Sequence, residues 1–287
     1  MKLLNFKKND SIHLGIKEER GIIDVTQAAA DHALDIPADM MTVIEQGAEA
    51  LKKLAGLGKG SLPAVREEDL VFCPCVTDPE KIICVGLNYI KHIAEAKMDV
   101  PLFPILFSKF SNALAAHNQK VALPKTAEKY DYEAELVIVI GKKASCVAKD
   151  EALSYVFGYT AGNDLSARDL QMRTSQWLLG KTCDGFAPIG PYLITAEEAD
   201  PDNLKLQCTV NGELRQSDNT SDMLFDCASI ISYASQYMTL KPGDIIFTGT
   251  PSGPVMGFPK DEQQWLKPGD EVTVTIEKIG SLTNIME

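Results

Sequence analysis

Residues 131–141 read DYEAELVIVIG, and this stretch decides the fold class. Its second half, Leu136 to Ile140, is an unbroken apolar run of strand length, which predicts a buried β-strand. Alternate side chains of a strand share a face, so Glu133 and Glu135 should point the same way. Two ionised carboxylates side by side at a core boundary repel each other and resist desolvation. A divalent cation would remove both penalties. The alternative is that both glutamates lie on a solvated strand end.

Segments outside this stretch favour a β-rich α+β domain. Lys81–Gly86 and Val156–Gly162 are apolar runs of strand length. The tetrapeptide Lys-Pro-Gly-Asp occurs at 241–244 and at 267–270, each time before a β-rich run, and its central Pro and Gly predict type II turns. Apolar residues at helical spacing predict a helix within Asp226–Leu240. Many strands with tight turns and few helices argue against a doubly wound parallel sheet.

The chain is predicted to divide into a small N-terminal α/β domain, residues 1–70, and a larger domain, residues 71–287. In the first of these, a helical pattern runs from about Met40 to Leu54. A Gly-rich piece, GLGKGSLPAV at 56–65, follows that helix. A phosphate-binding loop precedes its helix, so a linker is the prediction for this piece.

Composition and charge exclude several classes of partner. The 287 residues are 45% hydrophobic and 24% charged, which is typical of globular proteins. A formal net charge of −12 repels phosphate backbones and anionic lipids, so neither nucleic acid nor a membrane surface is an expected partner. We expect no secretory signal and no membrane span, which would need about 18 apolar residues. The seven cysteines match no zinc spacing and predict reduced thiols in a cytoplasmic protein.

A third carboxylate lies in the segment GYTAGNDLSARDLQ, at 158–171. Asp164 follows an apolar strand in this segment, where it either joins Glu133 and Glu135 or caps a helix beginning near Leu165. Three oxygen ligands without sulfur or imidazole favour a hard ion, Mg²⁺ or Mn²⁺, and leave room for water and a chelating substrate.

Other polar residues offer an acid–base pair and local cations. His92 and Glu95 are three residues apart and would be neighbours on a helix, where the carboxylate would orient the imidazole for taking a proton from water. The alternative is an exposed surface pair. Arg168 lies four residues after Asp164, hence on the same face if a helix forms there. Lys181 lies between glycines and prolines that indicate a fixed loop.

Together these motifs resemble the fumarylacetoacetate hydrolase family, over about residues 80–287 and in the family's order. The matching motifs are GLNYIKHIAEA at 86–96, DYEAELVIVIG at 131–141, GNDLSARDLQ at 162–171, GKTCDGFAPIGP at 180–191 and LKPGDIIFTGTPSG at 240–253. Two segments depart from the family pattern. Asn112–Gln119 lacks the usual Gly-Pro, and Pro254–Gly257 replaces a Gly-Val-Gly.

The resemblance implies a β-rich core of the family's rolled mixed-sheet type with a small N-terminal domain, assembled as a homodimer. It implies Mg²⁺ or Mn²⁺ held by Glu133, Glu135 and Asp164. It also implies catalytic roles for His92, Glu95 and Lys181, and substrate binding by Arg168, Gln171, Thr250 and Tyr89.

The implied activity is hydrolysis of a carbon–carbon bond in a small 2-oxo acid, an acylpyruvate or 2,4-dioxo acid, through a metal-stabilised enolate. Lys181 would stabilise the enolate, and His92, oriented by Glu95, would activate the attacking water. Two alternatives stay open. One is a decarboxylase or isomerase of oxaloacetate or an unsaturated oxo diacid, and the other is a non-catalytic ligand-binding module that keeps the metal pocket.

Overall fold

The computed structural model describes residues 1–57 and 62–287, and in it the strand expected at 136–140 lies inside a large sheet. Within the described residues this sheet has twelve strands: β1 (Lys2–Lys8), β2 (Ser11–Glu18), β3 (Gly21–Asp24), β4 (Ala64–Val65), β5 (Val71–Cys73), β6 (Ile82–Gly86), β7 (Ile105–Lys109), β8 (Leu114–Ala115), β11 (Ala134–Ile140), β12 (Val156–Asn163), β14 (Ala187–Thr195) and β17 (Ile245–Phe247). Their order is β4-β3-β2-β1-β14-β12-β11-β17-β6-β7, with β5 on β1 and β8 on β14. β17 and β6 are parallel whereas β11 is antiparallel to both neighbours, so the sheet is mixed.

A second sheet covers one face of the first. It has the order β16-β15-β18-β19-β9, and its strands are β9 (Lys120–Val121), β15 (Lys205–Val210), β16 (Glu213–Asn219), β18 (Glu271–Ile276) and β19 (Gly280–Met286). A short ribbon pairs β10 (Tyr130–Asp131) with β13 (Ser166–Ala167). The helices are α1 (Val25–Asp31), α2 (Met40–Gln46), α3 (Ala48–Leu54), α4 (Ile90–Ala96), α5 (Arg168–Gln171), α6 (Leu178–Lys181) and α7 (Cys227–Tyr237). The β-rich α+β class expected from the sequence is therefore confirmed.

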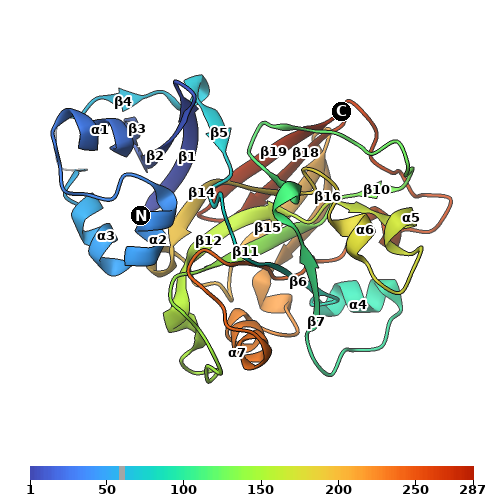
Figure 1. The fold of residues 1–287 in the computed structure, drawn as a ribbon. Helices are drawn as coiled ribbons and strands as arrows, with labels where there is room; N and C mark the ends of the chain where they lie inside the picture. The colour runs from blue at the N-terminus through green and yellow to red at the C-terminus, as the bar shows by residue number, and fades with distance from the viewer. Residues whose placement is uncertain (58–61) are drawn as a thin grey trace.

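β11 is buried on both faces, and its alternation decides what each face contacts. Leu136 and Ile138 belong to the apolar cluster that includes the second sheet. Val137 and Val139 belong to another cluster, shared with α2 and α3. Figure 1 shows the N-terminal elements at one side of the molecule and α4, α5 and α6 at the other. Because Glu133 and Glu135 precede Val137 in the same alternation, they share its face at the start of β11.

The two Lys-Pro-Gly-Asp segments form the same turn, as expected. Gly243 and Gly269 have φ of 86° and 94°, the left-handed conformation that position three of a type II turn requires. In 241–244 and 267–270 the N–H of the fourth residue donates to the carbonyl of the first, at 3.0 and 3.1 Å. Pro at position two and Gly at position three therefore have a direct structural reason.

Two helix expectations are wrong in detail. The pattern at 40–54 is not one helix, because Gly47, with φ 57° and ψ −125°, separates α2 from α3. No helix begins near Leu165 and Asp164 caps none, since the next residues enter β13 and α5 starts only at Arg168. Ser166 and Ala167 pair with β10, so their backbone is extended and cannot form a helix. Asp164 and Arg168 therefore do not share a helix face.

The N-terminal region joins the large sheet through β1, which pairs with β14 at Leu3↔Leu193. The domain boundary near residue 70 stays a prediction. The expected linker at 56–65 includes residues 58–61, which lie outside the described residues. Among the helices described, none is long and apolar enough to cross a membrane.

Candidate metal and active site

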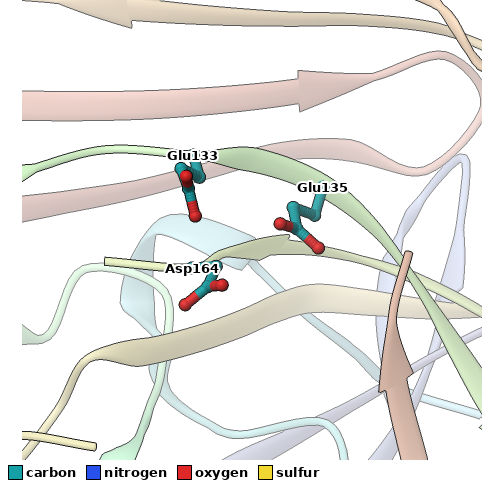
Figure 2. A group of neighbouring side chains, drawn as sticks. All are labelled: Glu133, Glu135 and Asp164. Atoms are coloured by element: carbon teal, nitrogen blue, oxygen red, sulfur yellow. The ribbon is translucent and has the colours of Figure 1, made fainter. Parts of the chain in front are cut away.

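Three buried carboxylates meet where β11 begins and β12 ends (Figure 2). Glu133 precedes β11, Glu135 is its second residue, and Asp164 follows β12 directly. The pairing Ala134↔Asn163 and a 2.9 Å hydrogen bond from Asp164 N–H to the Glu133 carbonyl bring the two segments together. One oxygen from each carboxylate lies within 4.8 Å of the others. Glu133 and Glu135 are only 6% and 2% exposed, so they do not lie on a solvated strand end.

Three cations border these carboxylates. Lys181 Nζ donates to Glu133 Oε2 and, at 2.8 Å, to Asp164 Oδ2. Arg168 Nη2 donates to Glu133 Oε1 at 2.7 Å. Lys109 Nζ lies 2.7 Å from Asp164 Oδ1. The site thus contains the cations that an anionic substrate needs, although the chain as a whole is acidic.

Glu135 carries the negative charge that these cations do not neutralise. Within the described residues it accepts a hydrogen bond from Gly249 N–H at 2.7 Å. Burial, together with the charges of the other two carboxylates, raises the pKa of Glu135 well above its usual range. Burial acts in the same direction on Glu133, but Arg168 and Lys181 outweigh it and hold that pKa below its usual value. A buried, all-oxygen group with surplus negative charge fits a divalent cation such as Mg²⁺ or Mn²⁺.

Two glycines let the backbone approach this site closely. Gly249 has φ +96°, and a Cβ there would lie 2.7 Å from the Cβ of Asn88. This glycine therefore lets its N–H reach Glu135 while the segment before α4 packs directly on it. At Gly180 a Cβ would collide with backbone atoms of Ala167 and Gln171, so its absence lets α6 hold Lys181 against the carboxylates.

His92 and Glu95 form a pair on α4, as the spacing predicts. His92 Nδ1 lies 3.2 Å from Glu95 Oε2. The two side chains are 13% and 25% exposed, which does not fit the alternative of an open surface pair. The Glu95 carboxylate also accepts the N–H of Gly253, at 3.1 and 3.2 Å to its two oxygens. Glu95 is thus fixed from two sides, and it leaves His92 Nε2 available for other contacts.

Three of the predicted substrate-binding residues hold one another or the backbone of β11. Arg168 Nη1 donates to Gln171 Oε1 at 2.9 Å. The Thr250 hydroxyl donates to the Ala134 carbonyl at 3.0 Å and accepts a hydrogen bond from Gln216 Nε2 at 2.8 Å. The Thr250 side chain therefore supports the strand that carries the glutamates. Substrate contact by these residues stays a prediction.

Tyr89 is fully buried, and its phenol has no hydrogen-bond partner among the described residues. Burial, with a further contribution from the Glu135 charge, raises the pKa of Tyr89 well above its usual value. A neutral phenol without a partner near a carboxylate site can donate to a ligand oxygen. This is what a substrate-binding role would require.

Sequence reasoning missed two buried charged residues of this site. Lys109 is 2% exposed, and its Nζ donates to three backbone carbonyls, those of Leu165, Lys181 and Phe186. A single lysine at a strand end gives no local signal of this role. Asp131 is fully buried and binds Arg168 Nε at 2.9 Å. Asp131, Glu133 and Glu135 follow one another at intervals of two, so extending the alternation by one step would have found it.

Comparison with known proteins agrees with this geometry. The family described as fumarylacetoacetate (FAA) hydrolase C-terminal matches residues 81–287. The chain is 40% identical to the oxaloacetate tautomerase FAHD2A, mitochondrial, of Homo sapiens over 289 residues, which cover 99% of this chain and 91% of the relative.

Solved structures show the same fold over the whole chain. The fumarylacetoacetate hydrolase of Exiguobacterium antarcticum superposes with a TM-score of 0.86 at 33% identity, covering 100% of this chain and 99% of that one. The maleylpyruvate hydrolase of Sphingobium sp. SYK-6 gives 0.82 at 30% identity, with 100% and 99% covered. The resemblance seen in the motifs is thus confirmed, and the chain belongs to the fumarylacetoacetate hydrolase family.

Proposed function

We propose that this chain is a divalent-ion-dependent enzyme that interconverts the keto and enol forms of oxaloacetate or a closely similar 2-oxo acid. The observation that carries the proposal is the buried Lys181 ammonium, held between Glu133 and Asp164. Keto–enol exchange places negative charge on the 2-oxo oxygen, and a fixed ammonium in a water-poor site stabilises that charge. The human relative at 40% identity, named an oxaloacetate tautomerase, supports this choice of reaction.

Glu133, Glu135 and Asp164 would hold the ion, Mg²⁺ or Mn²⁺. When bound, it would supply Lewis acidity to the carboxylate and 2-oxo oxygens of the substrate. The charges at the site favour binding of the ion before the substrate. Four carboxylates, counting Asp131, face three cations, a surplus of one negative charge that a divalent ion converts to a surplus of one positive charge. An anionic substrate would then be attracted.

The chain's own residues would orient the substrate and move its proton. Arg168 and Gln171 would bind the substrate carboxylate, and Lys181 would neutralise the developing enolate oxygen. His92 Nε2 would take the proton from the carbon beside the 2-oxo group and return it to the enolate oxygen. The C–H bond that breaks and the O–H bond that forms balance, so no other reactant is needed.

Hydrolysis of an acylpyruvate is the second candidate. The His92–Glu95 pair favours it, because an imidazole oriented by a carboxylate can activate water. The maleylpyruvate hydrolase at 30% identity supports it as well. In this reading the same enolate leaves after water attacks the distal carbonyl. His92→Ala should then abolish hydrolysis and leave ion affinity nearly intact, and hydrolysis at the wild-type rate in that variant would exclude the role.

A substrate panel separates the candidates. Oxaloacetate, acetylpyruvate, fumarylpyruvate and an unsaturated oxo diacid would be tested with Mg²⁺, Mn²⁺ and excess chelator, with Glu135→Ala as the control. Chelator-sensitive loss of the enol absorbance of oxaloacetate, without pyruvate or carbon dioxide, is the expected result. Pyruvate release from an acylpyruvate would instead identify a hydrolase, and carbon dioxide from oxaloacetate a decarboxylase. Ion binding without turnover of any substrate would identify a ligand-binding module.

Two further proposals concern assembly and location. We retain the homodimer that the family resemblance implies, which light scattering of the purified protein would test. The cytoplasmic location expected from the cysteines stays a prediction, and the human relative is named as a mitochondrial protein. Fractionation of cells that express the full chain would decide between the two compartments.

A further inference from the structure

Asp131 is a fully buried carboxylate that the proposed function counts in the charge of the site but assigns neither to ion binding nor to proton transfer. Its Oδ2 accepts hydrogen bonds from Arg168 Nε at 2.9 Å and from Met256 N–H at 3.1 Å. Its Oδ1 accepts from Val255 N–H at 2.7 Å and from Tyr132 N–H at 2.9 Å. Each oxygen therefore has two donors, and Asp131 joins the guanidinium to the loop Gly253–Gly257, called the 253–257 loop below.

Asp131 determines how Arg168 presents its guanidinium. Nε points to Asp131, Nη2 to Glu133 and Nη1 to Gln171. If Arg168 binds a substrate carboxylate, it must do so through Nη1 and Nη2, because Asp131 occupies Nε. Those nitrogens can change partner while the bond from Nε to Asp131 keeps the plane of the guanidinium fixed.

The 253–257 loop also touches the acid–base pair. The N–H of Gly253 donates to Glu95, which in turn contacts His92. Three residues of this loop thus bind two carboxylates, one on α4 and one beside Arg168. Val255 and Met256 present only backbone N–H groups to Asp131, which explains why the departure from the family pattern at Pro254–Gly257 is compatible with this contact.

We propose that Asp131 is a positioning residue that fixes Arg168 for the substrate and, through the 253–257 loop, couples it to the His92–Glu95 pair. A hydrogen-bonded route runs from His92 through Glu95, the loop, Asp131 and Arg168 to Glu133. The inference rests on the proposed function for the substrate-binding role of Arg168. The coupling between the loop and α4 stands on the contacts alone.

Asp131→Asn tests this role with little change of shape. Whichever way the new amide is turned, its NH₂ group faces two donors, so two of the four hydrogen bonds are lost. In one orientation the bond from Arg168 is lost, and in the other it is weakened because its acceptor is no longer charged. We therefore expect KM to rise about tenfold to a hundredfold. Affinity for Mn²⁺, measured by calorimetry without substrate, should change less than about threefold, because Asp131 lies outside the carboxylate trio.

Asp244→Asn is the matched control. Asp244 is also fully buried and binds one cation and two backbone amides, one amide fewer than Asp131: Lys81 Nζ at 3.1 Å, Lys81 N–H at 2.9 Å and Lys241 N–H at 2.8 Å. Asp244 lies just before β17, and Gly249, which contacts Glu135, lies beyond the other end of that strand. The two variants should lose similar Tm, but only Asp131→Asn should raise KM.

Hydrogen–deuterium exchange of the full chain without ligand gives a readout that is independent of activity. Asp131→Asn should speed exchange in the 253–257 loop and in α4, and Asp244→Asn should not. If Asp131→Asn does not fold, Arg168→Lys replaces it, because a lysine removes the Nε donor and keeps the charge. The same faster exchange in the loop is then expected.

Unchanged KM and unchanged exchange in Asp131→Asn would overturn the inference. An equal rise of KM in Asp244→Asn would also overturn it, since general destabilisation would then explain the effect. So would a loss of Mn²⁺ affinity of about tenfold or more, which would make Asp131 part of the ion site. If the wild type turns over no 2-oxo acid, the proposed function fails, and the exchange measurement alone decides the coupling.

Discussion

Buried carboxylates in two regions of this molecule are built in opposite ways. In the N-terminal region Asp24 is surrounded by donors: Lys8 Nζ and Gln27 N–H each at 2.9 Å, and His13 Nδ1, also at 2.9 Å. At the candidate site the described residues give Glu135 one donor, the N–H of Gly249, and two carboxylates as neighbours. Asp24 thus has several partners, whereas Glu135 has fewer donors and lies beside two like charges.

The ionisation of the two groups responds accordingly. Burial opposes the charge of Asp24, but the hydrogen bonds from Lys8, Gln27 and His13 outweigh it and hold its pKa below the usual value. Burial and like charges raise the pKa of Glu135. A satisfied carboxylate stabilises the fold, whereas an unsatisfied group of carboxylates costs stability and indicates a ligand site. This difference separates a structural carboxylate such as Asp24 from a candidate ion ligand such as Glu135, although both are buried.

Replacing Glu135 should have the largest effect and should separate stability from function. Glu135→Gln keeps the shape and the acceptor for Gly249 N–H but removes the surplus charge. We expect ion-dependent turnover to fall about 10³-fold or more, because an ion ligand is lost. The Tm in chelator should stay the same or rise, since like-charge repulsion is relieved. Steady-state kinetics measures the turnover, and thermal unfolding with and without Mn²⁺ measures the stability and its increase on ion binding. Wild-type stabilisation by Mn²⁺ in this variant would contradict the assignment of Glu135 as a ligand.

Removing the Lys181 ammonium should have the next largest effect, with opposite signs for catalysis and ion binding. In Lys181→Met turnover should fall about 10²- to 10³-fold, because the enolate loses its fixed positive charge. Affinity for Mn²⁺ should rise, since the variant removes a cation beside Glu133 and Asp164 that repels the ion. Steady-state kinetics and calorimetry test the two signs. Turnover within tenfold of the wild type would remove Lys181 from the mechanism.

Local sequence patterns predicted the parts of the fold that depend on local rules. The apolar run at 136–140 gave the central strand, the two Lys-Pro-Gly-Asp segments gave their turns, and alternation placed Glu133 and Glu135 on one face. Contacts between distant segments have no such signal. Lys109 reaches Asp164 across 55 positions, a pairing that depends on the order of strands in the sheet.

Single residues also override a pattern. The helical spacing at 40–54 is real, yet Gly47 interrupts the helix because its backbone adopts a positive φ that other residues avoid. After Asp164 the helix expected near Leu165 gives way to a pairing between Ser166 and Asp131. That pairing brings Asp131 next to Arg168, so the part of the sequence where local reasoning failed belongs to the candidate site.

Asp24→Asn should have the smallest effect on function and a clear effect on stability. The free energy of unfolding should fall by about 1–3 kcal/mol, because hydrogen bonds to a charged acceptor are lost, while kcat and KM stay unchanged. The pKa of Asp24 is lower in the folded state than in the unfolded state. The contribution of its charge to the free energy of unfolding is therefore fully present above the unfolded-state pKa, about 4, and is lost as the pH falls through the folded-state pKa. The difference between wild type and variant should therefore shrink in acid, as denaturant unfolding at several pH values would show.

A constant difference down to pH values below both pKa values would mean that the charge of Asp24 contributes nothing. A changed KM would mean that the two regions are coupled, and the contrast between structural and functional carboxylates would then fail.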